Sequence, residues 1–377
     1  MPVARPVPNP PPPRTHRVDT LGVSRYGLAV MRLEKRGGQV QKAGLVGLVL
    51  LLGVPSSSTR SHTDGPSPSL PVRASELRAP HHCRFWGSVA DSIPGWVIEG
   101  HLITLPNSIC SLSVANDNGW SVGYYEGGDI RSPAKRSVPT PHREPFPHPP
   151  APALHRGAAP AYLDTLFDLA VAEGVHACPG VAVSHIRLCS SGLCDIPNPH
   201  PFHRVKDRRH WLMGHNGTID KTALLALIRP EYMAANPPQY GSGPEEWIDS
   251  DLYFIFMLQT LEDFGWRIKP ALGRVVQRLR EAIPGTGEQL NFFLTDGVAL
   301  WAYRQGKSLY YLADSTATGC AAVASQYPSA SQGDWIEMAD GEMATLERGG
   351  RVRAEDIEAY FDPSGTPGGV QTGRVRD

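Results

Sequence analysis

The pattern of apolar and polar positions divides the chain from residue 83 onward into strands and helices. Short stretches that alternate β-branched, aromatic and glycine residues are typical of strands. The predicted strands are 83–90, 118–128, 180–188, 290–296, 298–304, 308–314, 321–325 and the turn-containing run 335–352.

Between these strands, apolar residues recur at helical spacing. Residues 161–174 place Leu163, Leu166, Phe167 and Ala170 on one face, and Gly174 suits the position just after a helix. The order of strands, then helices, then strands predicts sheets covered by helices, which is an α+β layered domain.

Three further helices are predicted in the second half of the chain. Asp220 is a candidate N-cap for a helix over 221–228, and 250–265 is apolar and long enough for a buried helix. Residues 271–283 predict an amphipathic surface helix through Leu272, Val275, Val276 and Leu279.

Proline-rich segments interrupt this pattern. Seven of the first thirteen residues are proline, and a second proline-rich tract occupies 139–160. Because proline breaks regular ladders and offers no core, both are expected to be extended or disordered. We therefore predict a non-globular leader over 1–82, one domain over 83–362 with a proline-rich insert at about 131–158, and a flexible tail over 363–377.

Composition narrows the class of protein. The net charge is −1, so no global field attracts nucleic acid or an anionic membrane. No apolar run reaches 18 residues, and the run 43–54, which follows a basic stretch from Met31, makes a poor signal peptide. No glycine-rich nucleotide motif is present. We expect a cytoplasmic protein without nucleic-acid or membrane partners and without a cofactor, with export as the less favoured alternative.

The six cysteines are too few for a disulfide scaffold in a chain of 377 residues. Cys189 and Cys194 lie close together, but no second pair completes a zinc pattern. Most of the cysteines are expected to be small buried apolar residues.

Four segments stand out in the order of the chain: Cys83-Arg84-Phe85-Trp86-Gly87, His185-Ile186-Arg187, His215-Asn216-Gly217-Thr218-Ile219 and Asp249-Ser250-Asp251. In this order and spacing they resemble the class II glutamine amidotransferase domain, the cysteine branch of the N-terminal-nucleophile hydrolases, and most closely its small stand-alone members. The resemblance covers residues 83 to 350. It implies a four-layer αββα sandwich of the N-terminal-nucleophile hydrolase type and a glutamine amidohydrolase or amidotransferase.

Each segment has a chemical reason to be in such a site. A thiol is mostly protonated at pH 7, whereas an α-amine of pKa about 7.7–8 can act as its base. Cys83 is therefore the predicted nucleophile once it becomes the first residue, and the alternative is a buried inert cysteine. The Asn216 amide and the Gly217 N–H are the predicted oxyanion hole.

Substrate binding is assigned to charged residues and one histidine. Arg187 offers a planar fork for an α-carboxylate, and Asp249 can bind the α-ammonium, with Asp251 as the second choice. A strand-end arginine and a helix N-cap are the structural alternatives for Arg187 and Asp249. His215 is placed with the substrate-binding residues. A metal site at His185 and His215 is not favoured, because no third ligand is apparent.

The leader leaves three accounts open: a propeptide cut before Cys83, an artefact of gene calling, or a protein that keeps its leader and is inactive. The predicted reaction is glutamine hydrolysis through a thioester on Cys83, alone or with a separate ammonia-accepting synthase, since no synthase domain follows residue 362. The alternatives are hydrolysis of a larger γ-glutamyl conjugate and a non-catalytic binding domain.

Overall fold

A computed structural model describes residues 82–126, 150–283, 289–313 and 319–362. These residues all belong to Val72–Asp377, one of two units into which the chain divides. The predicted leader apart from His82, the tail after residue 362 and most of the predicted insert lie outside the described residues.

The first sheet has seven strands, and every neighbouring pair is antiparallel. β1 lies near its middle because it pairs with β10 on one side and β4 on the other. In spatial order the strands are β11 (Ile336–Glu337), β9 (Tyr310–Leu312), β10 (Cys320–Ala324), β1 (Arg84–Ala90), β4 (Val181–Ile186), β2 (Trp120–Tyr125) and β3 (Ala153–Gly157).

The second sheet has six strands, again antiparallel throughout. β6 and β7 pair in register so that Asn216 lies opposite Asn291. In spatial order the strands are β13 (Arg351–Asp356), β12 (Glu342–Glu347), β8 (Leu300–Tyr303), β7 (Asn291–Thr295), β6 (Arg209–Asn216) and β5 (Phe202–Lys206).

Three apolar clusters show that the sheets lie face to face between two layers of helices. The cluster between the sheets contains Phe85 and Val89 of β1 together with Phe293 of β7 and Leu300 of β8. The next residues along β1, such as Trp86, face the opposite way and pack with the helices of the first half. This alternation is what a strand buried on both faces requires.

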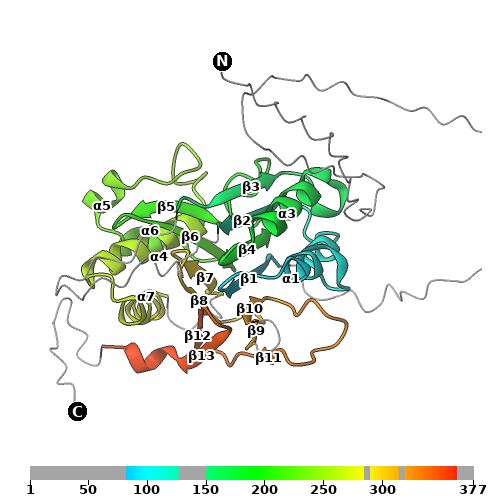
Figure 1. Cartoon of the computed structure of the whole chain (residues 1–377). Coiled ribbons are helices and arrows are strands. Elements are labelled where there is room, and N and C mark those ends of the chain that lie inside the picture. Colours follow the sequence, from blue (N-terminus) through cyan, green and yellow to red (C-terminus); the bar gives the residue numbers. More distant parts are fainter. Residues whose placement is uncertain (1–81, 127–149, 284–288, 314–318, 363–377) are drawn as a thin grey trace, which may run out of the picture. The chain divides into compact units, whose positions relative to one another are not determined.

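The helices divide between the two outer faces (Figure 1). Those of the first half are α1 (Gly95–Glu99), a π-helical turn (Gly100–Thr104), α2 (Ile109–Leu112), a 3₁₀ turn (Ala161–Leu163) and α3 (Thr165–Ala177). Those of the second half are α4 (Lys221–Leu227), α5 (Pro230–Ala235), α6 (Asp249–Asp263), α7 (Ile268–Ala282) and a 3₁₀ turn (Ile357–Tyr360). The predicted α+β four-layer αββα sandwich is confirmed.

Most of the predicted elements are present, and Asp220 caps α4 as expected by accepting from the N–H groups of Thr222 and Ala223 (2.7 and 3.3 Å). The prediction for α3 is partly wrong. Phe167 is buried there, but Leu163 and Leu166 are exposed. The helix also continues past Gly174, which faces the Tyr124 ring, and ends at Ala177 with Cys178 as its C-cap.

The end of the predicted proline-rich insert is also corrected. Residues 153–157 form β3, which pairs with β2 over five residues. An edge strand needs a partner on one side only, so prolines just outside it do not break a ladder. Of the predicted insert, residues 131–149 lie outside the described residues.

Candidate active site

Cys83 lies directly before β1, and its side chain contacts the residue that follows Arg187. The Cys83 thiol lies 3.4 Å from the Leu188 carbonyl, and the Leu188 N–H donates to Cys83 Sγ at 3.3 Å. Burial raises the pKa of this thiol above its ordinary value. The Leu188 N–H and the charge of Arg187 act in the opposite direction but do not reverse the shift, and Asp249 adds to it. With its α-nitrogen in a peptide bond, Cys83 is therefore a protonated thiol at neutral pH.

Two small cavities bring the predicted residues together. Cys83, Arg187, His215, Gly217 and Asp249 all line one of about 10 Å³. The other, of about 60 Å³, has Asn216 in its wall, and Cys83 and Gly217 line both. A volume of 10 Å³ holds roughly one water molecule, so an amino-acid substrate needs this cavity to widen.

Asn216 and Gly217 end β6 at the edge of these cavities. The Asn216 side chain is buried, and its Oδ1 has no hydrogen-bond partner among the described residues. Gly217 is packed so closely against the next segment that an added Cβ would lie 1.8 Å from the Gln289 carbonyl oxygen. Glycine is thus needed here for close backbone approach, and sheet pairing to Asn291 fixes the backbone position of Asn216.

Arg187 is buried, and a loop of its own chain holds both arms of the guanidinium. Nη1 donates to the Leu193 carbonyl (2.7 Å) and Nη2 to the Ser191 carbonyl (2.8 Å). A surface arginine at a strand end is therefore wrong as an alternative. These two bonds use two of the five N–H donors of the guanidinium, so others are left for a carboxylate in the 10 Å³ cavity, and the loop fixes how the guanidinium is oriented.

A disulfide between Cys189 and Cys194 closes that loop, with 5.6 Å between the Cα atoms. The expectation that most cysteines are buried apolar residues is wrong: these two are bonded, Cys178 is exposed and, outside the disulfide, only Cys320 is fully buried. Asn118 also anchors the loop by accepting from the Cys189 N–H (2.9 Å). The spacing of two cysteines in the sequence does not show whether they form such a short-range disulfide or stay reduced.

The two acidic residues at the start of α6 have different surroundings. Asp249 accepts from the Ile219 N–H through Oδ2 (2.8 Å) and lines the 10 Å³ cavity. The prediction of Asp251 as a substrate contact is not supported: it accepts from Arg204 (2.8 Å) and the Gln239 N–H (2.5 Å), and lines neither cavity. Residues two apart on a helix do not share a face, so only one of the pair can point to the site.

Hydrogen bonds determine the protonation of His185. The Asn198 amide lies 3.1 Å from His185 Nδ1, and His185 Nε2 lies 3.0 Å from the His215 carbonyl. Nε2 therefore donates and Nδ1 accepts, which makes the ring neutral. Burial, opposed by the His215 carbonyl, lowers the pKa of His185 to about 3.

His215 has both ring nitrogens engaged as well, by Ser250 Oγ (2.8 Å) and the Gln289 carbonyl (2.8 Å). In this form of the protein it therefore ties β6 to α6 and to the segment before β7 while lining the 10 Å³ cavity. Within the described ranges, no group of three or more His, Cys, Asp or Glu side chains is placed to hold a metal ion.

His200 lines the same cavity and was given no role by the sequence argument. Its ring stacks on His185 with 4.2 Å between centroids, and neither of its nitrogens has a hydrogen-bond partner among the described residues. Burial, together with the nearby cationic groups, places the pKa of His200 well below its ordinary value. Its position within Asn198-Pro199-His200-Pro201-Phe202 was the available signal, but a histidine between prolines does not reveal which way it faces.

Residues 168–316, which include Arg187, Asn216, Gly217 and Asp249, match the family described as glutamine amidotransferases class-II. Over these residues the chain has the sequence pattern of a class II glutamine amidotransferase domain. A match to this family implies enzymatic activity. No curated protein matches the chain.

Solved structures similar to this chain are distant in sequence. They include a glutamine aminotransferase class-II domain protein from Silicibacter pomeroyi (22% identity, 73% of this chain and 99% of that one, TM-score 0.44). A predicted glutamine amidotransferase from Pseudomonas aeruginosa shows 18% identity over 72% and 100% of the two chains (TM-score 0.39). Glutamine phosphoribosylpyrophosphate amidotransferase from B. subtilis shows 14% identity over 73% of this chain and 49% of its own (TM-score 0.44).

The helices of the described segments are all too short or too polar to cross a membrane. The apolar run 43–54 lies outside those segments.

Proposed function

We propose that this amidotransferase domain hydrolyses a γ-glutamyl amide, glutamine in the simplest case, through a thioester on Cys83 after the chain has been cut before that residue. The observation that carries the proposal is the meeting of Cys83, Arg187, Asp249, Asn216 and Gly217, from four separate segments, around two cavities that share Cys83 and Gly217.

The cut before Cys83 is needed because it frees the α-amine that acts as the base. While Cys83 is joined to His82, its α-nitrogen is an amide and accepts no proton, and burial holds the thiol protonated. A freed α-amine has an ordinary pKa of about 7.7–8, so it is available at neutral pH and lies on the same residue as the thiol.

In the proposed reaction the α-amine takes the thiol proton and the thiolate attacks the amide carbon. Negative charge develops on the amide oxygen, where the Asn216 side chain and the Gly217 N–H would stabilise it. The carbon–nitrogen bond then breaks, and the amine leaves with the proton held by the α-ammonium. Water attacks the thioester with the α-amine again as base, which releases glutamate and restores the thiol.

The amino-acid end of the substrate would be held by charge. Asp249 suits the α-ammonium, and Arg187 suits the α-carboxylate through the N–H groups that do not donate to Ser191 and Leu193. We propose that the 188–194 loop moves when substrate binds, because Leu188, Ser190 and Ser191 line a cavity that is too small for an amino acid. A separate synthase that accepts the ammonia is a further proposal.

The test uses the full chain with a site-specific protease sequence in place of the residues directly before Cys83. The protein is cut after folding, and intact mass confirms that the new first residue is Cys83. Within the part of the chain that the structure describes, every residue of the three apolar clusters lies after Cys83, so the cut leaves these clusters whole. Cut protein is expected to release glutamate from glutamine, and uncut protein is expected to be inactive.

The variant Cys83→Ala, cut in the same way, is expected to lose at least about 10³-fold in kcat because the nucleophile is gone. Cys178→Ser, a change at an exposed cysteine, is the matched control and should keep wild-type activity. Equal activity of wild type and Cys83→Ala would refute the mechanism. An inactive, correctly cut wild type would favour the non-catalytic binding domain.

A further inference from the structure

A third and much larger cavity adjoins the 60 Å³ cavity that Cys83 lines. It has a volume of about 530 Å³, within the range of small-molecule sites. His82 is part of its wall and also of the wall of the 60 Å³ cavity that holds Cys83, Asn216 and Gly217. Residue 82 therefore separates the nucleophile from this larger space in the uncut chain.

The walls of the 530 Å³ cavity are cationic. Arg84 and Lys307 line it, and no acidic residue is among the described residues that do. Partial burial, with the charge of Arg84 nearby, lowers the pKa of Lys307, which places the two cations within electrostatic reach of each other. An anion between them would relieve that repulsion.

Both cations contact the residue that cutting would remove. Lys307 Nζ donates to His82 Nε2 (2.7 Å), and Arg84 Nη1 donates to the His82 carbonyl (3.1 Å) as well as to that of Cys83 (3.3 Å). Loss of His82 withdraws an acceptor from each of them at the same moment that it frees the Cys83 α-amine.

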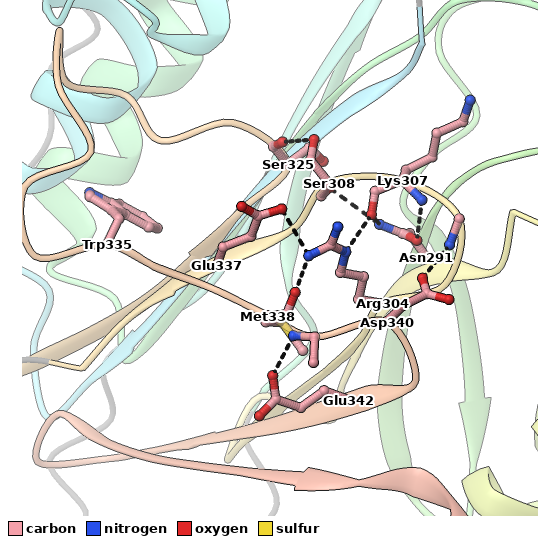
Figure 2. A network of polar contacts seen from close by, with 12 residues as sticks. Asn291, Arg304, Lys307, Ser308, Ser325, Trp335, Glu337, Met338, Asp340 and Glu342 are labelled. Atoms are coloured by element: carbon pink, nitrogen blue, oxygen red, sulfur yellow. Dashed lines mark hydrogen bonds and ion pairs between the residues drawn. The ribbon is translucent and has the colours of Figure 1, made fainter.

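A fixed scaffold carries Lys307 to this place. The buried Asn291 side chain donates to the Lys307 carbonyl (3.0 Å) and accepts from the Lys307 N–H (3.3 Å), and Arg304 Nε donates to the same carbonyl (3.0 Å). Ser308 donates to the Ser325 carbonyl (2.9 Å) and ties this loop to the end of β10. Figure 2 shows the Lys307 side chain extending away from this network. The backbone that carries the Lys307 side chain is thus held in place by these contacts.

The direction in which an amine leaves follows from the proposed mechanism. The leaving nitrogen takes its proton from the α-ammonium of Cys83, so it must lie beside that nitrogen. In the uncut chain the Cys83 α-nitrogen is bonded to His82, and His82 lines the 530 Å³ cavity. Anything attached to the leaving nitrogen would extend into this space.

We propose that the 530 Å³ cavity binds an anionic group on the leaving amine of the substrate, with Lys307 and Arg84 as its counter-charges after His82 has been cut away. The inference rests on the proposed function and names its substrate class: γ-glutamyl amides of amines that carry a carboxylate or phosphate, such as γ-glutamyl amino acids. Ammonia from glutamine needs no cavity of this size. The bonds made and broken are those of glutamine hydrolysis, and an amino acid leaves in place of ammonia.

The experiment measures glutamate release by the cut full-length protein from four substrates. γ-Glutamyl-alanine carries the carboxylate, γ-glutamyl-alaninamide replaces it with a neutral group of the same shape, and a derivative of 1-aminoethylphosphonate replaces it with a phosphate-like anion. Glutamine is the reference. We expect kcat/KM for γ-glutamyl-alanine to exceed that for γ-glutamyl-alaninamide by about tenfold, as for loss of one charge-assisted hydrogen bond. If kcat/KM for the phosphonate substrate is larger than that for γ-glutamyl-alanine, the result supports the anion site and indicates that it prefers a phosphate group.

Lys307→Met keeps the length of the side chain and removes its charge. It is expected to lower the ratio of kcat/KM for γ-glutamyl-alanine to that for γ-glutamyl-alaninamide by about tenfold. Lys206→Met is the matched control, because Lys206 pairs with Glu262 and lines none of the three cavities. Its ratio should be that of the wild type.

Two results separate the inference from the proposed function. Release of glutamate from glutamine that depends on Cys83, with equal kcat/KM for the charged and neutral conjugates, overturns the inference alone. The inference alone is also overturned if Lys307→Met and the wild type have the same ratio of kcat/KM for γ-glutamyl-alanine to that for γ-glutamyl-alaninamide. No release from any of the four substrates overturns the inference and the proposed function together.

Discussion

At the scale of single residues, the site is made of polar groups that are buried and held by named partners. Arg187 is 2% exposed, with both arms on loop carbonyls, and Asp249 is 2% exposed, with a carboxylate oxygen on the Ile219 N–H. Buried polar groups are normally satisfied in this way. Of the described residues that line the two small cavities, Asn216, through Oδ1, and His200, through both ring nitrogens, have buried polar atoms without a hydrogen-bond partner and so keep bonding capacity for a ligand.

Replacing Asn216 by alanine tests the oxyanion role. If its amide stabilises the developing charge, Asn216→Ala in the cut protein lowers kcat for glutamine by about 10²–10³-fold, with little change in KM, because the contact strengthens only in the transition state. Asn236→Ala, at the end of α5, is the control and should behave as wild type. A raised KM with an unchanged kcat would assign Asn216 to ground-state binding instead.

At the scale of elements, short connections determine the geometry of the site. β4 ends at Ile186, and the disulfide-closed loop that follows supplies both carbonyls that hold Arg187. The same loop reaches α6, since Ser191 Oγ accepts from the Asp249 N–H (3.3 Å). The carboxylate-binding and ammonium-binding groups are therefore positioned together, and movement of this loop changes both.

Close packing after β6 leads to a prediction about stability. In Gly217→Ala the new Cβ would meet the Gln289 backbone, which moves less easily than a side chain. We expect the free energy of unfolding, measured by urea denaturation, to fall by about 1–3 kcal/mol, as for overpacking. Gly243→Ala is the control, because its added Cβ would have no described atom within 4 Å apart from those of the glycine and its two chain neighbours. Equal effects of the two substitutions would show that the 217–289 contact does not limit stability.

At the scale of the whole molecule, the four layers enclose histidines in apolar cores. His101 accepts from Trp86 Nε1–H through Nδ1 (2.9 Å) and lies between the first sheet and its helices. Burial lowers the pKa of His101 to about 4 and, offset by its hydrogen bond, that of His185 to about 3. Protonation of His101 would remove the acceptor that Trp86 uses.

Stability is therefore expected to fall with acidification. Below the ordinary histidine pKa near 6.5 the unfolded chain binds protons that the folded chain does not, so the free energy of unfolding rises with pH. This contribution is fully present above about pH 6.5 and is lost as the pH falls towards 4 for His101 and 3 for His185. Each histidine contributes a slope of up to about 1.4 kcal/mol per pH unit.

Urea denaturation at several pH values between 7 and 5 checks this slope. His101→Gln keeps an acceptor for Trp86 and should reduce the slope by about one histidine's share, whereas His176→Gln, at an exposed position on α3, should keep the wild-type slope. An unchanged slope in His101→Gln would show that its burial does not control the acid sensitivity.

Much of this structure follows from local pattern. The residues of β1, α6 and α7 were predicted because alternation and helical spacing extend through each of them, and Asp220 because a capping aspartate precedes its helix. Prediction failed where burial depends on a distant partner. Leu163 and Leu166 have the spacing of a buried face, yet only the placement of α3 against the first sheet decides that Phe167 is the residue covered.

The sequence by itself determined the types of element, their order and the chemical groups available for a site, because backbone period and side-chain chemistry are properties of neighbouring residues. The tertiary structure alone decided which groups share a space. It turned Asp251 towards Arg204, joined Cys189 to Cys194, placed His200 beside the cavity of Arg187 and brought Lys307 to His82 across 225 positions of sequence. The reason is physical: such contacts depend on how two sheets and their helices pack, and no local pattern encodes that packing.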